Sequence, residues 1–330
     1  MTSLIPHNAL RKAALISIAI AALPLTALSQ APAYPNKPIR LIVPWAPGGT
    51  SDTPWRILAP KLSDALGQPI VIENRPGAAS TIGAAVVAAA RPDGYTLLGT
   101  SNVHVMSANV YKNLPYNAIT DFTPIAQIAQ TCSVLVVHPS LPVHSAREFI
   151  GYAKANPGKI DFSSTGNGSG QHLFMALLAS STGISLNHVP YKSVGQATAE
   201  LVAGQVKASI PGVSVVAPFV ADGKLRALAV TCAKRSRFLP DVPTLDETAV
   251  PGFDATLREG MMAPKGVAPE ILARLESEIK KIMDLPEIQK SIVGTTNEPV
   301  FAPSTRFAAD LKTESAKWQK LVNEIGVHAD

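Results

Sequence analysis

The chain has 330 residues and a formal net charge of +5, from 29 Lys and Arg against 24 Asp and Glu. This excess is small and forms no basic cluster, so the sequence gives no reason to expect a nucleic-acid partner. The length suffices for two lobes with separate cores, and the low aromatic content with many Ala, Val, Gly and Pro favours an α/β protein with short connections.

A signal peptide is predicted at the start of the chain, over residues 1–33. Arg11 and Lys12 precede an apolar run, and small residues follow it, with cleavage expected after Ser29 or Ala33. A permanent membrane anchor is the alternative, but the run is short and contains a proline. No later stretch of the sequence is long and apolar enough to cross a membrane, so we expect an exported mature protein.

The segment from Ile39 to Asp52 predicts a strand, a glycine turn and the start of a helix. Four of its first five residues are apolar, as a buried strand requires. Gly48 and Gly49 allow the backbone to approach another molecule closely, and Asp52 and Pro54 are residue types found at helix N-termini. A helix start presents unpaired backbone N–H groups, so this place favours an anion.

The same order then repeats. The helix that follows is expected to stop at Gly67, with Pro60 as an awkward residue in its interior. A second strand begins at Ile70 and leads into a second glycine-containing turn, a helix at about 79–90 and a third strand at 95–98. Alternating strands and helices predict a parallel sheet with helices on both faces and ligands beyond the carboxyl ends of its strands.

The middle of the chain follows the same plan. Strands are expected at 134–137 and 160–163, with a helix at 145–156 between them. A third turn, Thr165–His172, carries three glycines and precedes a helix that ends at Gly183. The remaining predicted elements are a helix near 196–203, a strand at 224–231, and helices at about 269–283, after Pro286 and at 304–325.

The two cysteines, Cys132 and Cys232, leave two interpretations open. In an oxidising compartment they would form one disulfide that closes a loop of roughly a hundred residues, worth about 4–5 kcal/mol in the loop-entropy model. Two buried, unpaired thiols are the alternative. The spacing contains no C-x-x-C motif, so it indicates no metal or redox site.

Several short motifs in fixed order resemble one known family. They are Tyr34–Pro44 (YPNKPIRLIVP), Pro47–Asp52 (PGGTSD), Leu66–Ala78 (LGQPIVIENRPGA), Ala90–Leu98 (ARPDGYTLL), Lys154–Gly158 (KANPG), His188–Lys192 (HVPYK) and Leu239–Thr244 (LPDVPT). Together they resemble the extracytoplasmic solute-binding receptors of tripartite tricarboxylate transporters, the Bug family. The resemblance runs from about Tyr34 to the C-terminus.

The resemblance implies an α/β protein with the type II periplasmic-binding-protein fold: two lobes joined by a hinge, with ligand held in the cleft between them. By resemblance, residues 34–133 and 258–330 form lobe 1, residues 134–257 form lobe 2, and the hinge lies near 130–135 and 255–260. It also implies a periplasmic monomer that binds a small carboxylate by lobe closure, without a cofactor, and delivers it to the permease subunits of a tripartite tricarboxylate transporter.

Three glycine-bearing turns are predicted to hold the carboxylate through backbone N–H groups, because such hydrogen bonds to an anion are short and strong. The candidate ligand-binding residues are Trp45, Gly48, Gly49, Ser51, Asp52, Gly77, Ala78, Ala79, Ser80, Ser101, Thr165, Gly166, Gly168, Ser169, His172 and Tyr191. Asp52 would repel an anion, so we expect it to order the loop instead. For His172, a cleft hydrogen bond and a packing role are both open.

The ligand is expected to be a larger mono- or dicarboxylate, with an aromatic body as one option, rather than a short amino or hydroxy acid. Trp45 and Trp55 lie near the first glycine turn, and the segment 209–215 lacks the polar, acid-containing character common in this family. Trp55 as core filler is the alternative to Trp55 stacking on the ligand.

Other classes of function find little support in the sequence. The turn at 165–170 does not complete G-x-G-x-x-G because residue 171 is Gln, and no nucleophile elbow or metal-ligand spacing of histidines occurs. The protein is therefore not expected to be an enzyme. A transcription regulator would need a DNA-binding segment where the leader stands. An exported receptor that acts on a sensor protein stays an alternative.

Overall fold

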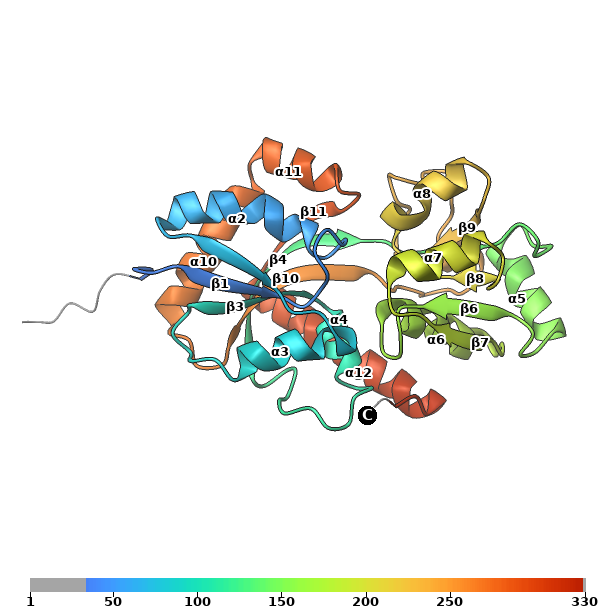
Figure 1. The fold of residues 1–330 in the computed structure, drawn as a ribbon, viewed down its shortest axis with the longest axis horizontal. Coiled ribbons are helices and arrows are strands. Elements are labelled where there is room, and N and C mark those ends of the chain that lie inside the picture. Colours follow the sequence, from blue (N-terminus) through green and yellow to red (C-terminus); the bar gives the residue numbers. More distant parts are fainter. Residues whose placement is uncertain (1–33, 329–330) are drawn as a thin grey trace, which may run out of the picture. The chain divides into compact units, whose positions relative to one another are not determined.

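The computed structural model describes residues 34–328, and its strands form two β-sheets (Figure 1). The predicted signal peptide lies outside these residues. The six-stranded sheet has the order β11-β4-β10-β3-β1-β2, and the five-stranded sheet has the order β7-β6-β8-β5-β9. The strands are β1 Ile39–Val43, β2 Ile70–Asn74, β3 Thr96–Ser101, β4 Phe122–Thr131, β5 Val134–Val137, β6 Asp161–Ser164, β7 Asn187–Pro190, β8 Ala208–Ser209, β9 Arg226–Val230, β10 Leu257–Pro264 and β11 Glu298–Pro303. The helices are α2 Thr53–Leu66, η1 Ala78–Ser80, α3 Thr81–Ala88, α4 Val103–Ser107, α5 Ala146–Ala155, α6 Gly170–Thr182, α7 Val194–Val202, α8 Val213–Ala221, α9 Leu245–Thr248, α10 Pro269–Met283, α11 Pro286–Val293 and α12 Ser304–Ile325.

Both sheets are mixed, so the expectation of a parallel sheet was wrong for part of each. β1 pairs in parallel with β2 and β3, as the strand–helix–strand order predicts. β10, however, runs antiparallel to both β3 and β4, and β5 runs antiparallel to β8 and β9. The chain leaves the six-stranded sheet through β4 and returns to it through β10, and for this reason these two strands run in opposite directions.

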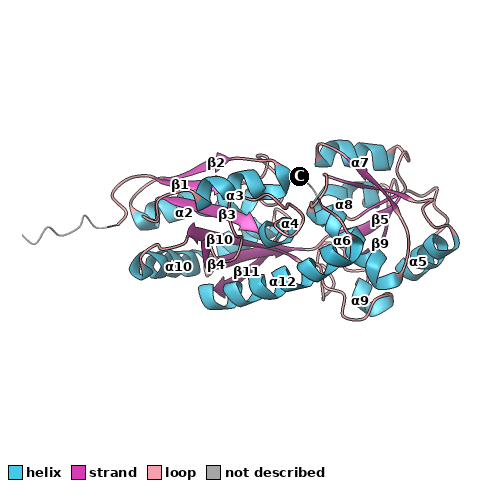
Figure 2. Cartoon of the chain, turned by 90° about the horizontal axis from the view of Figure 1, so that it is seen from below, coloured by secondary structure: helices cyan, strands magenta, loops and turns pink. Residues whose placement is uncertain are grey.

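Helices cover both faces of the six-stranded sheet (Figures 1 and 2). α2, α10 and α11 contact one another on one face, and α12 and α4 contact each other on the opposite face, where α3 also packs. Among residues 34–328, no helix has the length and apolar character needed to cross a membrane.

The strand β5 separates two cores in the five-stranded sheet. Leu135 and Val137 belong to one core cluster with Phe149 and Phe174, whereas Val134 and Val136 belong to another on the opposite face. Side chains alternate between the faces of a strand, so four consecutive apolar residues fill both sides. This explains why the short run of residues 134–137 reads as a buried strand.

The last helix, α12, reaches beyond the sheet on which it starts. Its Trp318 is fully buried and lies 5.7 Å, centroid to centroid, from the ring of Phe174 on α6. Trp318 also shares a core cluster with Met106 of α4 and Leu135 of β5. The C-terminal half of α12 therefore connects the elements of the two sheets through a common apolar core.

Helix boundaries follow the sequence signals closely. α10 and α12 have the bounds predicted from the sequence, and Gly67 ends α2 with a φ of 70° and an N–H donated to Ser63 O at 2.9 Å. Pro60 lies inside α2 without ending it. Glycine reaches this left-handed conformation without the steric cost of a Cβ atom, and the helix stops there for this reason.

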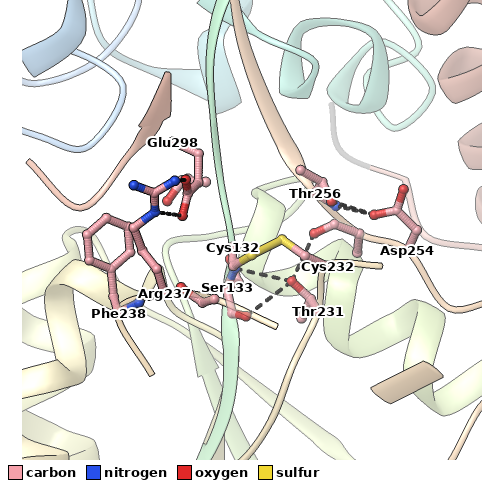
Figure 3. The surroundings of a disulfide bond; sticks show 12 residues. Cys132, Ser133, Thr231, Cys232, Arg237, Phe238, Asp254, Thr256 and Glu298 are labelled. Carbon is pink, nitrogen blue, oxygen red and sulfur yellow. Dashed lines mark hydrogen bonds and ion pairs between the residues drawn. A yellow bond between two sulfur atoms is a disulfide. The ribbon is translucent and has the colours of Figure 1, made fainter. Parts of the chain in front are cut away.

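The segments that connect the two sheets are joined to one another (Figure 3). Cys132 and Cys232 form a disulfide between the chain after β4 and the chain after β9. Thr231 donates its N–H to Ser133 O at 2.9 Å, and it accepts the N–H of Ala255 at 2.9 Å. The open question between a disulfide and two thiols is thus answered, and three chain segments are held side by side where the sheets meet.

Candidate functional site

A cavity of about 950 Å³ lies where the helix starts of the two sheets face each other. The three predicted glycine turns all contribute to its wall. Of the candidate residues, those in the wall are Trp45, Gly48, Gly49, Ser51, Gly77, Ala78, Ala79, Ser80, Ser101, Thr165 and Ser169. The other five do not line the cavity: Asp52, Gly166, Gly168, His172 and Tyr191. The turns come from distant parts of the chain, yet they surround one space.

The first turn is held from behind by Asp52. This side chain is fully buried and accepts the N–H of Gly48 at 2.7 Å and the amide of Asn74 at 2.7 Å, and it pairs with Arg56. Burial alone would raise the pKa of Asp52, but the hydrogen bonds from Arg56, Asn74 and Gly48 lower it below its ordinary value. Asn74 also donates to Trp45 O at 2.9 Å. Asp52 therefore fixes the shape of the loop without entering the cavity.

The second turn has an unusual backbone. Ala78, Ala79 and Ser80 have φ angles of 43°, 48° and 80°, in a region that residues with a Cβ atom seldom adopt. Each such residue costs on the order of 1–2 kcal/mol. Among the described residues, the buried hydroxyl of Ser80 has no hydrogen-bond partner. The strained segment thus places small residues and an unused hydroxyl at the cavity wall.

The third turn precedes α6. Gly166 and Gly168 have φ angles of 110° and 73°, and Ser169 caps the helix by accepting the N–H of His172 at 3.3 Å. The first N–H groups of a helix have no partner within it, so those of Gly170 and Gln171 remain for the cavity, which both residues line. Gly166 and Gly168 shape the turn but do not line the cavity.

His172 has a packing environment. Its ring stacks on that of His188 at 4.0 Å between centroids, and its Nδ1 accepts the N–H of Gly168 at 3.2 Å. Burial lowers the pKa of His172 to about 4, with a smaller contribution from His188, and burial likewise lowers the pKa of His188 to about 4. Both rings are therefore neutral at pH 7, and the geometry matches the packing interpretation of His172.

Two further helix starts line the cavity that the sequence analysis did not include. The wall contains Lys192 to Gly195, at the start of α7, and Gly212 and Ser214, at the start of α8. Ser193 accepts the N–H of Gln196 at 3.2 Å, a serine cap that its position three residues before Gln196 could have indicated. No such signal marked Gly212 because an apolar stretch surrounds it.

Charge in the wall is sparse. Among the described residues that line the cavity, Lys192 is the one charged residue, and none is Asp or Glu. Instead, the starts of five helices, α2, α3, α6, α7 and α8, lie at the wall, where helix dipoles place partial positive charge. Some of their first N–H groups are already used, because Thr53 donates to Gly49 O and Val213 donates to Cys132 O. Within the described chain, no group of three His, Cys, Asp or Glu side chains could hold a metal ion. The arrangement is chemically suited to an anion.

The two tryptophans differ in their placement. Trp45 lines the cavity, and its indole N–H has no hydrogen-bond partner in the part of the chain described. Trp55 is fully buried against β3, where a Cβ atom on Gly99 would lie 2.8 Å from the indole ring. Stacking of Trp55 on a ligand is therefore wrong, and the core interpretation holds. Of the two tryptophans, Trp45 alone is placed to contact an aromatic ligand.

Comparisons with known proteins give the family and the fold. The family model described as "Tripartite tricarboxylate transporter family receptor" matches residues 55–327. Protein BugT of Bordetella pertussis is 35% identical over 321 residues, which is 97% of this chain and 98% of that protein. The solved structure of R. palustris Rpa4515 with adipate has a TM-score of 0.80 at 32% identity and covers 89% of this chain and 99% of its own. MatC from Rhodopseudomonas palustris with bound malate has a TM-score of 0.77 at 28% identity and covers 88% and 100%. The two-lobe periplasmic-binding-protein fold expected from the sequence is confirmed.

Proposed function

Because this chain belongs to the tripartite tricarboxylate transporter receptor family, whose members are periplasmic solute-binding receptors, we propose that it captures a small dicarboxylate and delivers it to a membrane permease. The observation that carries this proposal is the cavity wall itself. The starts of five helices and one lysine line the cavity, and none of the described lining residues is Asp or Glu. Such a wall favours an anionic ligand.

Two carboxylates are favoured over one because donors lie on opposite sides of the cavity. The starts of α2 and α3 belong to segments of the six-stranded sheet, and the starts of α6, α7 and α8 belong to segments of the five-stranded sheet. A linear diacid can place one carboxylate at each side. The adipate and malate bound by the two related structures are both diacids, which supports the same class of ligand here. An aromatic diacid that uses Trp45 is part of this proposal.

The proposed mechanism is lobe closure about the connecting segments, with lobe 1 made of residues 34–133 and 258–330 and lobe 2 of residues 134–257. The solute first meets one set of helix starts, and rotation near 130–135 and 255–260 brings the other set onto it. The ligand favours the closed form only by its higher affinity for that form. The candidate residues in the wall would then donate to the carboxylates, while Asp52 keeps the first loop in shape.

Calorimetry on the exported, mature protein tests the ligand class. We expect heat from adipate, malate or a benzoate-type diacid, and a higher melting temperature with the same compounds. Gly49→Asp should abolish binding, because it adds an anion to the wall. Gly49→Ala is its matched control: an added Cβ atom would lie 3.4 Å from Ala46 O, so the loop accepts it, and binding should persist. Equal binding by both variants would contradict the proposed site.

Delivery is tested in cells. Loss of this receptor should abolish uptake of the labelled diacid that it binds, and the permease genes should be needed for the same uptake. Unchanged uptake, with loss of a transcriptional response to the diacid, would instead support a receptor that acts on a sensor protein.

A further inference from the structure

Glu259 is a buried carboxyl group directly behind the cavity wall. It lies on β10, is fully buried, and its Oε1 lies 2.5 Å from the hydroxyl oxygen of Ser51. Ser51 lines the cavity. In the register of β10 with β3, Glu259 stands opposite Ser101, which lines the cavity as well. Paired residues of neighbouring strands point to the same face, so the side chain of Glu259 faces this wall.

The second oxygen of this carboxyl group has no partner among the described residues. Glu259 Oε2 is buried and accepts no hydrogen bond. Ionised carboxylates are seldom buried in this state, because their desolvation is not compensated. Burial raises the pKa of Glu259 to about 7, against a smaller lowering by the Ser51 hydrogen bond. A proton can therefore be held here near neutral pH.

Among residues 34–328, the groups around Glu259 provide no cationic partner for it. β3 supplies the hydroxyl of Ser101, and β4 supplies Ala129 opposite Glu259. In the loop before α2, Ser51 contacts Glu259 directly. Two charged residues are sequence neighbours of this pair: Asp52 follows Ser51, and Arg258 precedes Glu259. Asp52 pairs with Arg56, and Arg258 pairs with Asp254 and Glu314. The protonation of Glu259 thus depends mainly on burial and on Ser51.

A serine hydroxyl has one hydrogen, and its direction depends on the partner. When Glu259 is ionised, Ser51 must donate this hydrogen to the carboxylate and turn its lone pairs to the cavity. When Glu259 is protonated, it can donate to Ser51, whose own hydrogen is then free to point into the cavity. A ligand carboxylate is repelled by the first arrangement and bound by the second.

We propose that Glu259 is a positioning residue that carries a proton and aims the Ser51 hydroxyl at the ligand, so that capture of a carboxylate takes up one proton. This inference rests on the proposed function of the cavity. Ser51 then donates a hydrogen bond to the ligand only when Glu259 is protonated. It also couples capture to the acidity of the surrounding compartment, since the anionic ligand and an ionised Glu259 do not coexist.

The proposed proton uptake makes ligand affinity fall as the pH rises. Below about pH 6 Glu259 is already protonated, so affinity should not change with pH until the ligand itself titrates. Above about pH 7, binding must add a proton to Glu259, and affinity should fall by up to about tenfold for each pH unit. Glu259→Gln should remove this dependence, because the amide N–H₂ group donates to Ser51 at every pH.

The experiment is calorimetry of the mature protein with adipate, or with malate if adipate does not bind, at pH 6 to 9. Each pH is measured in two buffers of different ionisation enthalpy, which gives the number of protons taken up. We expect close to one proton at pH 8 for the natural chain and none for Glu259→Gln. Glu73→Gln, which removes a surface carboxyl paired with Arg40, is the matched control and should keep the natural profile.

A flat pH profile of the natural chain, or an unchanged slope in Glu259→Gln, would overturn the proposal. A separate measurement needs no ligand. The infrared spectrum of the free protein at pH 6 should contain a protonated-carboxyl band that fades toward pH 8 and that Glu259→Gln lacks. Absence of that band at pH 6 also overturns the proposal. If neither diacid binds at any pH, the proposed function fails, and the infrared band then decides the inference by itself.

Discussion

The hydroxyl groups of Thr50 and Ser214 lie 3.3 Å apart, and this hydrogen bond joins the first glycine turn to the start of α8. The two residues are 164 positions apart in sequence and both line the cavity. The contact therefore connects the loop of one sheet to a helix of the other, across the space where we propose that the ligand binds.

Ser214→Ala should weaken ligand affinity. The contact is present when the helix starts face each other, so its loss favours the open form, at a cost of about 1 kcal/mol or roughly fivefold in affinity. Calorimetry with the best diacid measures the change. Thr50→Ser keeps a hydroxyl at the contact and should retain most of the affinity, and a larger loss in Thr50→Ser than in Ser214→Ala would refute this account.

Glu259 should also make the stability of the protein depend on pH. Its pKa is raised to about 7 in the folded protein, above the ordinary value of 4.5, so its contribution to stability is fully present below about pH 4.5. This contribution is lost as the pH rises toward 7 and stays lost above it. Glu259→Gln should therefore gain about 2 to 3 kcal/mol on the natural chain between pH 5 and pH 8. Denaturant titrations at both pH values measure this gain, with Glu73→Gln as control, and a constant difference would contradict it.

Ala79→Gly should stabilise the protein. The φ of Ala79 is 48°, where glycine has no steric penalty, so we expect a gain of about 1 kcal/mol. Ala85→Gly is the matched control, because Ala85 lies inside α3 and its replacement should cost about 1 kcal/mol. Thermal unfolding of the two variants should shift in opposite directions. Destabilisation by both would show that the second turn carries no relievable strain.

Removal of the disulfide should destabilise the protein strongly. The bond between Cys132 and Cys232 spans 100 residues, for which the loop-entropy model gives about 4–5 kcal/mol. The double variant Cys132→Ser with Cys232→Ser should unfold at a clearly lower denaturant concentration. The natural chain in reducing agent should approach the same midpoint, and a reduced chain as stable as the oxidised one would exclude this contribution.

Much of the fold could be predicted because its signals are local. α10 starts with Pro269 and α2 ends at Gly67, and both boundaries depend on the conformational limits of a single residue. The strands β4, β10 and β11 were not predicted, and the antiparallel direction of β10 depends on the path of the chain through the second sheet and back. Periodicity marks a strand, but it does not indicate the direction of that strand.

The same distinction applies to the site: residues marked by a local pattern were predicted, and residues that depend on distant contacts were not. The turns at Gly48, Gly77 and Gly166 were predictable because glycine before a helix is a local pattern. Gly212 was missed since its apolar surroundings hide the helix start, and Glu259 was missed since its partner Ser51 is 208 residues away. Trp55 was placed near the ligand from its sequence distance to the first turn, yet the helix α2 turns it into the core. Residues next to each other in sequence face different ways once a helix begins.

Trp318 of α12 and Phe174 of α6 lie 5.7 Å apart, centroid to centroid, so separation of these two helices would expose two large aromatic rings to water. If the lobes separate as proposed, the contact between α12 and α6 would stay closed. The lobes would separate on the cavity side, where the contacts between described residues include the one between the hydroxyls of Thr50 and Ser214. Solute would enter there, over the loop that carries Thr50, and would leave by the same way.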